Sequence, residues 1–210
     1  MNTTIKRFQP HWLLTLLFIV LVALLRIPNA AQLTPWANFS PIGAMGLFGG
    51  AYFTKRYQAI LLPILCLFLS DLAINLIVFN GKYGIMYDGW YVIYAVIAGI
   101  ALMGHWMLKR VTVWRVLGAG VMASLLHWMV ADFSVWAAGG TDLRTLQPLA
   151  RNAEGLLQCY VQGFPYFKHF LLGTLAYSAV LFGVMSWISS RYFTFNAIQT
   201  TAPYGRDEQA

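Results

Sequence analysis

Charged side chains are scarce in this sequence. Only 10% of the 210 residues are Asp, Glu, Lys or Arg, whereas 59% are hydrophobic and the mean hydropathy is +0.62. A typical soluble domain carries ~25% charged residues. So few charges cannot cover a water-facing surface, which excludes an ordinary soluble globular protein. The composition is typical of an integral membrane protein, whose exterior is solvated by lipid.

Cysteine is nearly absent as well. The sequence has two, Cys66 in an apolar run and Cys159 in an expected loop, and they provide no disulfide framework. His105 and His127 differ in expected depth by roughly 15 Å, too much for two axial haem ligands. No spacing of His and Cys resembles a zinc or iron–sulfur site. We therefore expect no metal and no cofactor.

The residue patterns of an enzyme or a nucleic-acid binder are also missing. No phosphate-binding loop and no nucleophile beside a base stand out. His127 and Asp132 lie about 140° apart around a helix and do not form a simple dyad. The net charge of +7 is not accompanied by interleaved basic and aromatic residues. We expect neither catalysis nor a nucleic-acid partner, and an intramembrane enzyme is the weakest of the alternatives.

Long apolar runs are what the sequence does contain. A hydrocarbon core ~30 Å thick needs roughly 20 helical residues, and five runs approach this length while the second is short. The sequence predicts an all-α polytopic membrane protein with six transmembrane helices in one domain, residues 1–192, followed by a polar cytoplasmic tail, residues 193–210. The expected spans are 11–25, 39–53, 57–79, 87–108, 113–138 and 166–188.

The first run has two interpretations. Lys6 and Arg7 followed by a short apolar stretch resemble a signal peptide. Arg26 and Pro28, however, stand where the cleaving protease needs small residues. This pattern favours a span that is kept.

The positions of the basic residues predict the orientation. With six spans, nine Lys and Arg fall on one side and five on the other, where the connections are longer. The positive-inside rule then places both termini in the cytoplasm and the longest connection, residues 139–165, outside. The nine are Lys6, Arg7, Lys55, Arg56, Lys109, Arg110, Arg115, Arg191 and Arg206, and the five are Arg26, Lys82, Arg144, Arg151 and Lys168.

Ionisable residues in the spans are few and define a candidate site. Asp71 and Asn75 share one face of the third span, ~12 Å from its outer end, and Asp132 lies ~9 Å from the outer end of the fifth. Arg26 ends the first span on the same side. One interpretation is that Arg26 merely neutralises one of the carboxylates. The other is a solute pocket that opens outward.

In the pocket interpretation each class of side chain has a role. The carboxylates supply negative charge or acceptors and the guanidinium balances them or contacts a solute carboxylate. The amides offer hydrogen bonds, and the aromatic residues offer a stacking surface and a lid. The predicted set is Arg26, Asn38, Asp71, Asn75, Asp132, Trp136 and Tyr160.

Two glycines of the short second run have a spacing that allows close helix packing. Gly46 and Gly50 form a small-xxx-small motif. Their partner could be a helix of the same chain or of another subunit. Internal packing is favoured because a short span needs cover.

Several blocks of sequence resemble a family of small bacterial membrane proteins known only as a domain of unknown function. They extend over the second, third, fifth and sixth spans. The blocks are NFSPIGA at 38–44, LFGGAYF at 47–53, SDL at 70–72, DFSVW at 132–136, GLLQCY at 155–160, FPYF at 164–167 and LLGTLAYS at 171–178.

The LFGGA helix, the basic turn and the SDL helix end are more distantly similar to the substrate-binding S-components of energy-coupling-factor (ECF) transporters. That resemblance implies a multi-pass protein of the bacterial inner membrane with an outward pocket for a small, vitamin-like or metal-related solute. It also implies an energising transporter module as a partner. S-components dock on that module through a stripe of small residues on the first span, whereas the run 11–25 here is mostly large.

Two functions therefore remain at this stage. We expect an S-component-like protein that binds a small solute from the outer side for uptake. The alternative is a non-catalytic structural or assembly subunit of a larger membrane complex, which tight glycine packing and the lack of a nucleotide motif both favour.

Overall fold

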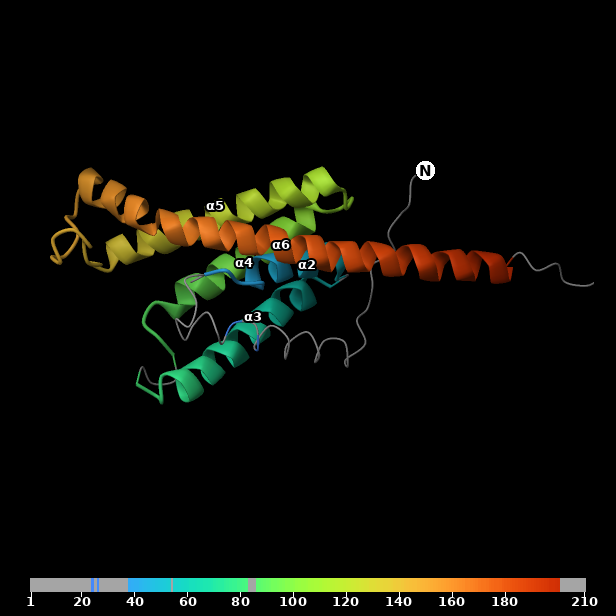
Figure 1. Ribbon diagram of the computed structural model, residues 1–210, viewed down its shortest axis with the longest axis horizontal. Coiled ribbons are helices and arrows are strands. Elements are labelled where there is room, and N and C mark those ends of the chain that lie inside the picture. Colours follow the sequence, from blue (N-terminus) through green and yellow to red (C-terminus); the bar gives the residue numbers. More distant parts are fainter. Residues whose placement is uncertain (1–23, 25, 27–37, 54, 83–85, 201–210) are drawn as a thin grey trace, which may run out of the picture.

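The described part of the chain is a bundle of helices in a computed structural model (Figure 1). The structure describes residues 24, 26, 38–53, 55–82 and 86–200, with side chains up to residue 187. Within these ranges there are helices and loops and one isolated β-bridge, Thr141 to Pro148. The helices are α2 (Ile42–Tyr52), α3 (Arg56–Ala73) with its π-helical continuation η1 (Ile74–Val78), α4 (Trp90–Met107), α5 (Val113–Ala137) and α6 (Ala153–Thr200).

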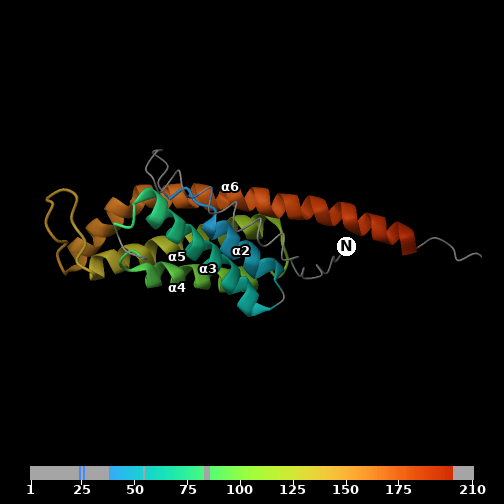
Figure 2. The same cartoon turned by 90° about the horizontal axis from the view of Figure 1, so that it is seen from below.

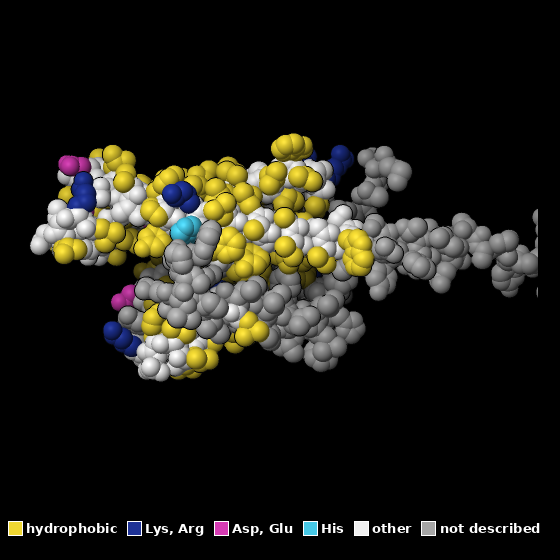
Figure 3. All heavy atoms as spheres, in the orientation of Figure 1, with side chains coloured by type: hydrophobic (Ala, Val, Ile, Leu, Met, Phe, Trp, Pro, Cys, Tyr) yellow, Lys and Arg dark blue, Asp and Glu magenta, His cyan; other side chains and the backbone are white. Residues whose placement is uncertain are grey.

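Four of the described helices are long and apolar enough to cross a membrane. They are Arg56–Val78, Trp90–Met107, Val113–Ala137 and Ala153–Trp187. Hydrophobic side chains cover much of the face that Figure 3 shows, most plainly along α5 and α6, as expected where lipid is the solvent. The expectation of an all-helical membrane protein is therefore confirmed for the described residues. The predicted span 11–25 lies outside them, apart from Leu24.

The short helix α2 lies in the middle of the bundle in both views (Figure 1 and Figure 2). It contacts α3, α4, α5 and α6, and nine of its eleven residues are buried. Eleven residues rise only ~16 Å, so α2 cannot span a membrane alone. Its apolar residues are covered by the longer helices instead.

Glycines bring α2 and α4 into backbone contact. A Cβ added to Gly50 would collide with the carbonyl oxygen of Ala101, and one added to Gly104 would lie 2.6 Å from the carbonyl oxygen of Leu47. Gly46 faces Ile100. The structure therefore places the Gly46 and Gly50 stripe against a helix of the same chain, where it is not available for docking another subunit.

The prediction for the last helix was wrong at its start. Residues 139–165 were expected as one outer connection, but α6 begins at Ala153. Asn152 caps it, since its side-chain oxygen accepts a hydrogen bond from the Gly155 N–H at 2.9 Å. Pro165, expected as the last residue of this connection, lies inside α6. The helix also continues to Thr200, within the segment 193–210 expected as a tail.

The connection between α5 and α6 is therefore short and ordered by its own contacts. Asp142 accepts hydrogen bonds from the backbone N–H and the guanidinium of Arg144. The Gln162 side chain of α6 contacts the backbone of Thr141 and Leu143. We call residues 138–152 the outer hairpin, a name that follows the orientation expected from the sequence.

Candidate functional site

Two polar clusters lie toward the same end of the bundle. The loops that follow η1 and α5 both lie at the left end in Figure 1. Asp71 is seven residues before the end of the first of these helices and Asp132 five residues before the end of the second. One cluster involves α3 and α4, and the other lies between α5 and α6.

The first cluster is built around the buried carboxylate of Asp71. Arg26 Nη1 lies 2.6 Å from Asp71 Oδ1 and also donates to the Ser70 hydroxyl and, at 3.3 Å, to the Leu67 carbonyl oxygen. The Tyr94 hydroxyl of α4 donates to Asp71 Oδ2 at 3.1 Å. Both oxygens of this carboxylate therefore have partners, and its charge is neutralised within the cluster.

Two further residues lie near this cluster. Asn75 is buried like Asp71 and is the second residue of the π-helix η1, a local structure found often at functional sites. Tyr87 lies in the loop between η1 and α4. Burial, assisted by the nearby Asp71 carboxylate and opposed by Arg26, raises the pKa of the Tyr87 hydroxyl to about 12. This phenol therefore stays neutral beside the ion pair.

The second cluster is built around Asp132 and differs in its partners. Asp132 Oδ2 and Trp128 Nε1 are buried atoms without a hydrogen-bond partner. The Trp128 indole lies one helical turn before Asp132 on α5. It interacts with the Asp132 carboxylate, but the geometry between the two groups falls short of a hydrogen bond. The carboxylate lies directly against Gly163 of α6, where any Cβ would collide with it. A larger residue at this position would require the Asp132 side chain to move.

A small pocket adjoins the Asp132 carboxyl. Its volume is about 100 Å³. Asn38 and Tyr166 are the exposed members of its lining, so the pocket reaches the surface beside them. The ring of His127 stacks on Phe170 at a centroid distance of 4.1 Å. The lining residues are Asn38, His127, Trp128, Ala131, Asp132, Gly163, Tyr166 and Phe167. We call this the Asp132 pocket.

The predicted site residues are thus divided between two places. Asp71 and Asn75 belong with Arg26 to the first cluster, whereas Asn38 lines the pocket of Asp132. Neither Arg26 nor Asp71 is among the residues that line this pocket. The single convergent site expected from the sequence is therefore replaced by an ion-paired cluster and a separate pocket.

The two predicted aromatic residues have structural partners. The Trp136 indole donates to the Ala150 carbonyl oxygen at 2.9 Å and so ties the outer hairpin to α5. Tyr160 was expected in a mobile outer connection, but it lies within α6 and donates to the Met129 carbonyl oxygen at 3.1 Å. Tyr160 is therefore a residue of a helix and not of a loop, and its role as a lid stays a prediction.

Trp128 and Gly163 are among the residues of the Asp132 pocket that the predicted site set lacks. Trp128 precedes Asp132 by one helical turn, and that spacing could have identified it. Gly163 carries no such signal, because its contact with Asp132 joins residues 31 apart on different helices.

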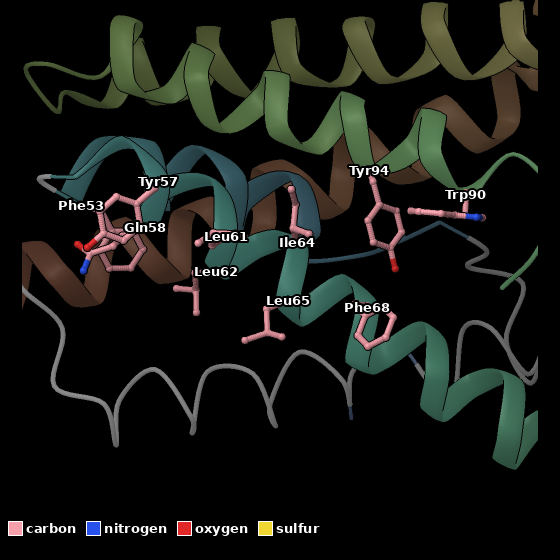
Figure 4. Close-up of a pocket in the computed structure, with 10 residues that line it drawn as sticks. All are labelled: Phe53, Tyr57, Gln58, Leu61, Leu62, Ile64, Leu65, Phe68, Trp90 and Tyr94. Carbon is pink, nitrogen blue, oxygen red and sulfur yellow. The ribbon is translucent and has the colours of Figure 1, made fainter. Parts of the chain in front are cut away.

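A larger groove runs along the exposed face of α3 (Figure 4). Its volume is about 730 Å³, and its lining is mostly apolar. Tyr57 and Leu61, which line it, are more than half exposed. The groove ends at Trp90 and Tyr94 (Figure 4). A surface of this kind suits hydrocarbon better than a polar solute.

The donor set for a bound metal is small. Among the described residues no group of three His, Cys, Asp or Glu side chains could hold a metal ion. The Asp132 pocket offers one carboxylate and one imidazole, fewer than the three protein ligands usual in catalytic zinc sites.

The comparisons with known proteins give a family but no activity. No curated protein and no solved structure matches the chain. One family model matches residues 6–200, which is nearly the whole sequence. The chain therefore belongs to the "Family of unknown function (DUF6580)".

Proposed function

We propose that this protein binds a small solute from the outer side of the bacterial inner membrane and takes part in its uptake, in the manner of an ECF S-component. The proposed architecture has six spans and both termini in the cytoplasm. The observation that carries the proposal is the Asp132 pocket, where a buried carboxyl oxygen and a buried indole N–H lie unpartnered at a cavity that reaches the surface. Buried polar atoms are normally satisfied, so such exceptions suggest a missing ligand.

The charges at the two ends support the proposed orientation. The end where α3 begins and α4 meets α5 carries Lys55, Arg56, Lys109, Arg110 and Arg115. At the other end, the three basic residues of the loops, Lys82, Arg144 and Arg151, are balanced by Asp88, Asp142 and Glu154. Excess positive charge favours the cytoplasmic side, so the Asp132 pocket would open outward.

A partner is part of this proposal. The sequence has no phosphate-binding loop that could use a nucleotide, so energy for uptake would come from an energising transporter module or another membrane subunit. The Gly46 and Gly50 stripe cannot serve as the docking face because it packs on α4.

Uptake can be tested without knowing the solute. Cells that lack the gene, complemented with wild type or Asp132→Asn, are given a uniformly ¹³C-labelled cell extract, and the labelled compounds they accumulate are compared by mass spectrometry. We expect at least one small compound to accumulate with wild type and to fall at least tenfold with Asp132→Asn. Asp88→Asn, an exposed carboxylate outside the pocket, is the control and should accumulate normally. Identical profiles in all three strains would contradict the proposal.

A structural or assembly subunit of a larger complex is the second candidate. It is favoured by the satisfied ion-pair cluster of Arg26 and Asp71 and by the apolar groove on α3, neither of which requires a solute. Stoichiometric co-purification with other membrane subunits, combined with unchanged compound profiles, would favour this role.

A further inference from the structure

Among the described residues, no cation balances the charge of the Asp132 pocket. The described ion pairs are Arg26 with Asp71 and Arg144 with Asp142, and Asp132 has none. The described residues that line its pocket include no Lys or Arg. Lys168 is on the same helix as Gly163, but its ammonium lies over the ring of Phe164, 5.5 Å from the centroid. An ionised carboxylate in a span is costly unless a cation pairs with it.

Aromatic rings surround this carboxylate. The Trp128 ring packs with Phe167 at a centroid distance of 5.0 Å and edge-on with Tyr160 at 5.4 Å. Tyr166 lies at the mouth of the pocket. The faces of such rings attract cations within about 6 Å, most strongly those of Trp. A carboxylate framed by aromatic rings is suited to an organic ammonium group.

The size of the pocket further limits which ligands it can bind. A volume of about 100 Å³ corresponds to roughly three water molecules, whereas sites for whole drug-sized ligands have about 300–1,000 Å³. The pocket therefore admits a head group of a few atoms and not an entire vitamin. One carboxylate and one imidazole are too few ligands for a metal ion, as noted above.

We infer that the Asp132 pocket recognises a small organic ammonium group, through the Asp132 carboxylate and the ring of Trp128. This inference rests on the proposed solute site and names its substrate class. The unpartnered Trp128 N–H would donate a hydrogen bond to a neighbouring oxygen of the ligand, such as the hydroxyl of an amino alcohol. The same chemistry occurs in free amines and in the headgroup of phosphatidylethanolamine, and the experiment separates these two sources.

The test measures the thermal stability of the full-length protein in nanodiscs made of phosphatidylglycerol alone. Methylammonium and ethanolamine are added as chlorides, with sodium chloride, sodium acetate and ethylene glycol as the ionic-strength, anionic and neutral controls. A ligand that binds only the folded protein raises the melting temperature with concentration. A parallel set of nanodiscs contains phosphatidylethanolamine and receives no soluble amine.

We expect the two ammonium compounds to raise the melting temperature and the three controls to leave it unchanged. Asp132→Asn should weaken ammonium binding at least tenfold, whereas Asp88→Asn should bind like wild type. Trp128→Phe keeps a ring but loses the N–H. The difference in affinity between ethanolamine and methylammonium should therefore be smaller for this variant than for wild type. If only phosphatidylethanolamine stabilises the protein, and does so through Asp132, the ammonium site stands while the uptake function fails.

Other outcomes overturn the inference. Stabilisation by acetate or ethylene glycol that Asp132→Asn abolishes would disprove ammonium recognition and leave a solute site in place. Stabilisation by amines that persists in Asp132→Asn would place their binding elsewhere. The inference is also refuted if neither an amine nor phosphatidylethanolamine stabilises the wild-type protein. The uptake profiles described above would then decide the proposed function separately.

Discussion

The carboxylates of Asp71 and Asp132 lie at comparable distances from the ends of their helices but have opposite environments. Asp71 is held by a guanidinium and a phenol, so both of its oxygens are satisfied. Asp132 has an unpartnered oxygen at a cavity, with rings rather than cations around it. The interpretation in which Arg26 neutralises a carboxylate therefore describes Asp71. The functional interpretation concerns Asp132.

Breaking the Arg26 to Asp71 pair should destabilise the protein strongly. Arg26→Gln leaves a buried carboxylate without its cation, and losing one partner of a buried pair costs about 3–5 kcal/mol. Thermal unfolding in nanodiscs would measure the loss. The double variant Arg26→Gln/Asp71→Asn removes both charges and should recover much of the stability. A single variant as stable as wild type would mean that the pair does not anchor Arg26 to α3.

The stability of the outer hairpin should depend on pH only under acidic conditions. The side-chain hydrogen bond from Arg144, with its backbone N–H, holds the pKa of Asp142 below its ordinary value. A lowered pKa contributes stability that is complete above the unfolded value of about 3.9 and is lost as the pH falls through the folded pKa. We expect hydrogen exchange in residues 139–150, corrected for intrinsic rates, to be constant from pH 5 to 8 and to accelerate below about pH 4. Asp142→Asn should abolish this dependence, and an unchanged pH profile in that variant would refute the assignment.

At the scale of elements, the glycines of α2 determine how closely the bundle packs. The helix contacts four others, and its approach to α4 is limited by backbone atoms rather than by flexible side chains. A backbone cannot move aside as a side chain can. The α2 to α4 contact is therefore the packing least able to accept added volume.

Gly50→Ala should for this reason destabilise the protein, by about 1–3 kcal/mol, the usual cost of overpacking. Gly118 in α5 is the matched control, because a Cβ there meets no atom within 4 Å. Gly118→Ala should be neutral or stabilising by about 0.5–1 kcal/mol, since alanine is the better helix former. Thermal unfolding of the two variants decides the matter, and equal effects would contradict the close packing.

The spans of α3, α4 and α5 could be predicted from the sequence to within a few residues, because long apolar runs with charged ends have few alternatives. The start of α6 could not. The polar stretch before Tyr166 was taken as loop, but Asn152 supplies a helix cap and Pro165 is tolerated within the helix. The site was predictable only as single polar residues, since the contact of Asp132 with Gly163 depends on how two helices pack.

At the scale of the molecule, the early start of α6 changes how the topology can be tested. Cys159 was expected to be exposed outside, but it is buried and its thiol donates to the Asp132 carbonyl oxygen at 3.2 Å. Cys66 is buried too. We therefore expect neither native cysteine to react with an impermeant thiol reagent.

Introduced cysteines can report the orientation instead. Thr145→Cys in the outer hairpin and Val113→Cys at the opposite end are both exposed positions. In spheroplasts, whose cytoplasmic membrane is intact, we expect the reagent to label Thr145→Cys. It should label Val113→Cys only after that membrane is permeabilised. The reverse pattern would invert the proposed topology and place the Asp132 pocket on the cytoplasmic side.

The most direct test of the solute site is native mass spectrometry of the protein released gently from its own membrane. Wild type should carry a small molecule that dissociates on activation, as should Asp88→Asn. Asp132→Asn should be recovered without it, although folded. The contradicting result is a wild-type protein that carries no small molecule, or one whose bound molecule is retained equally by Asp132→Asn.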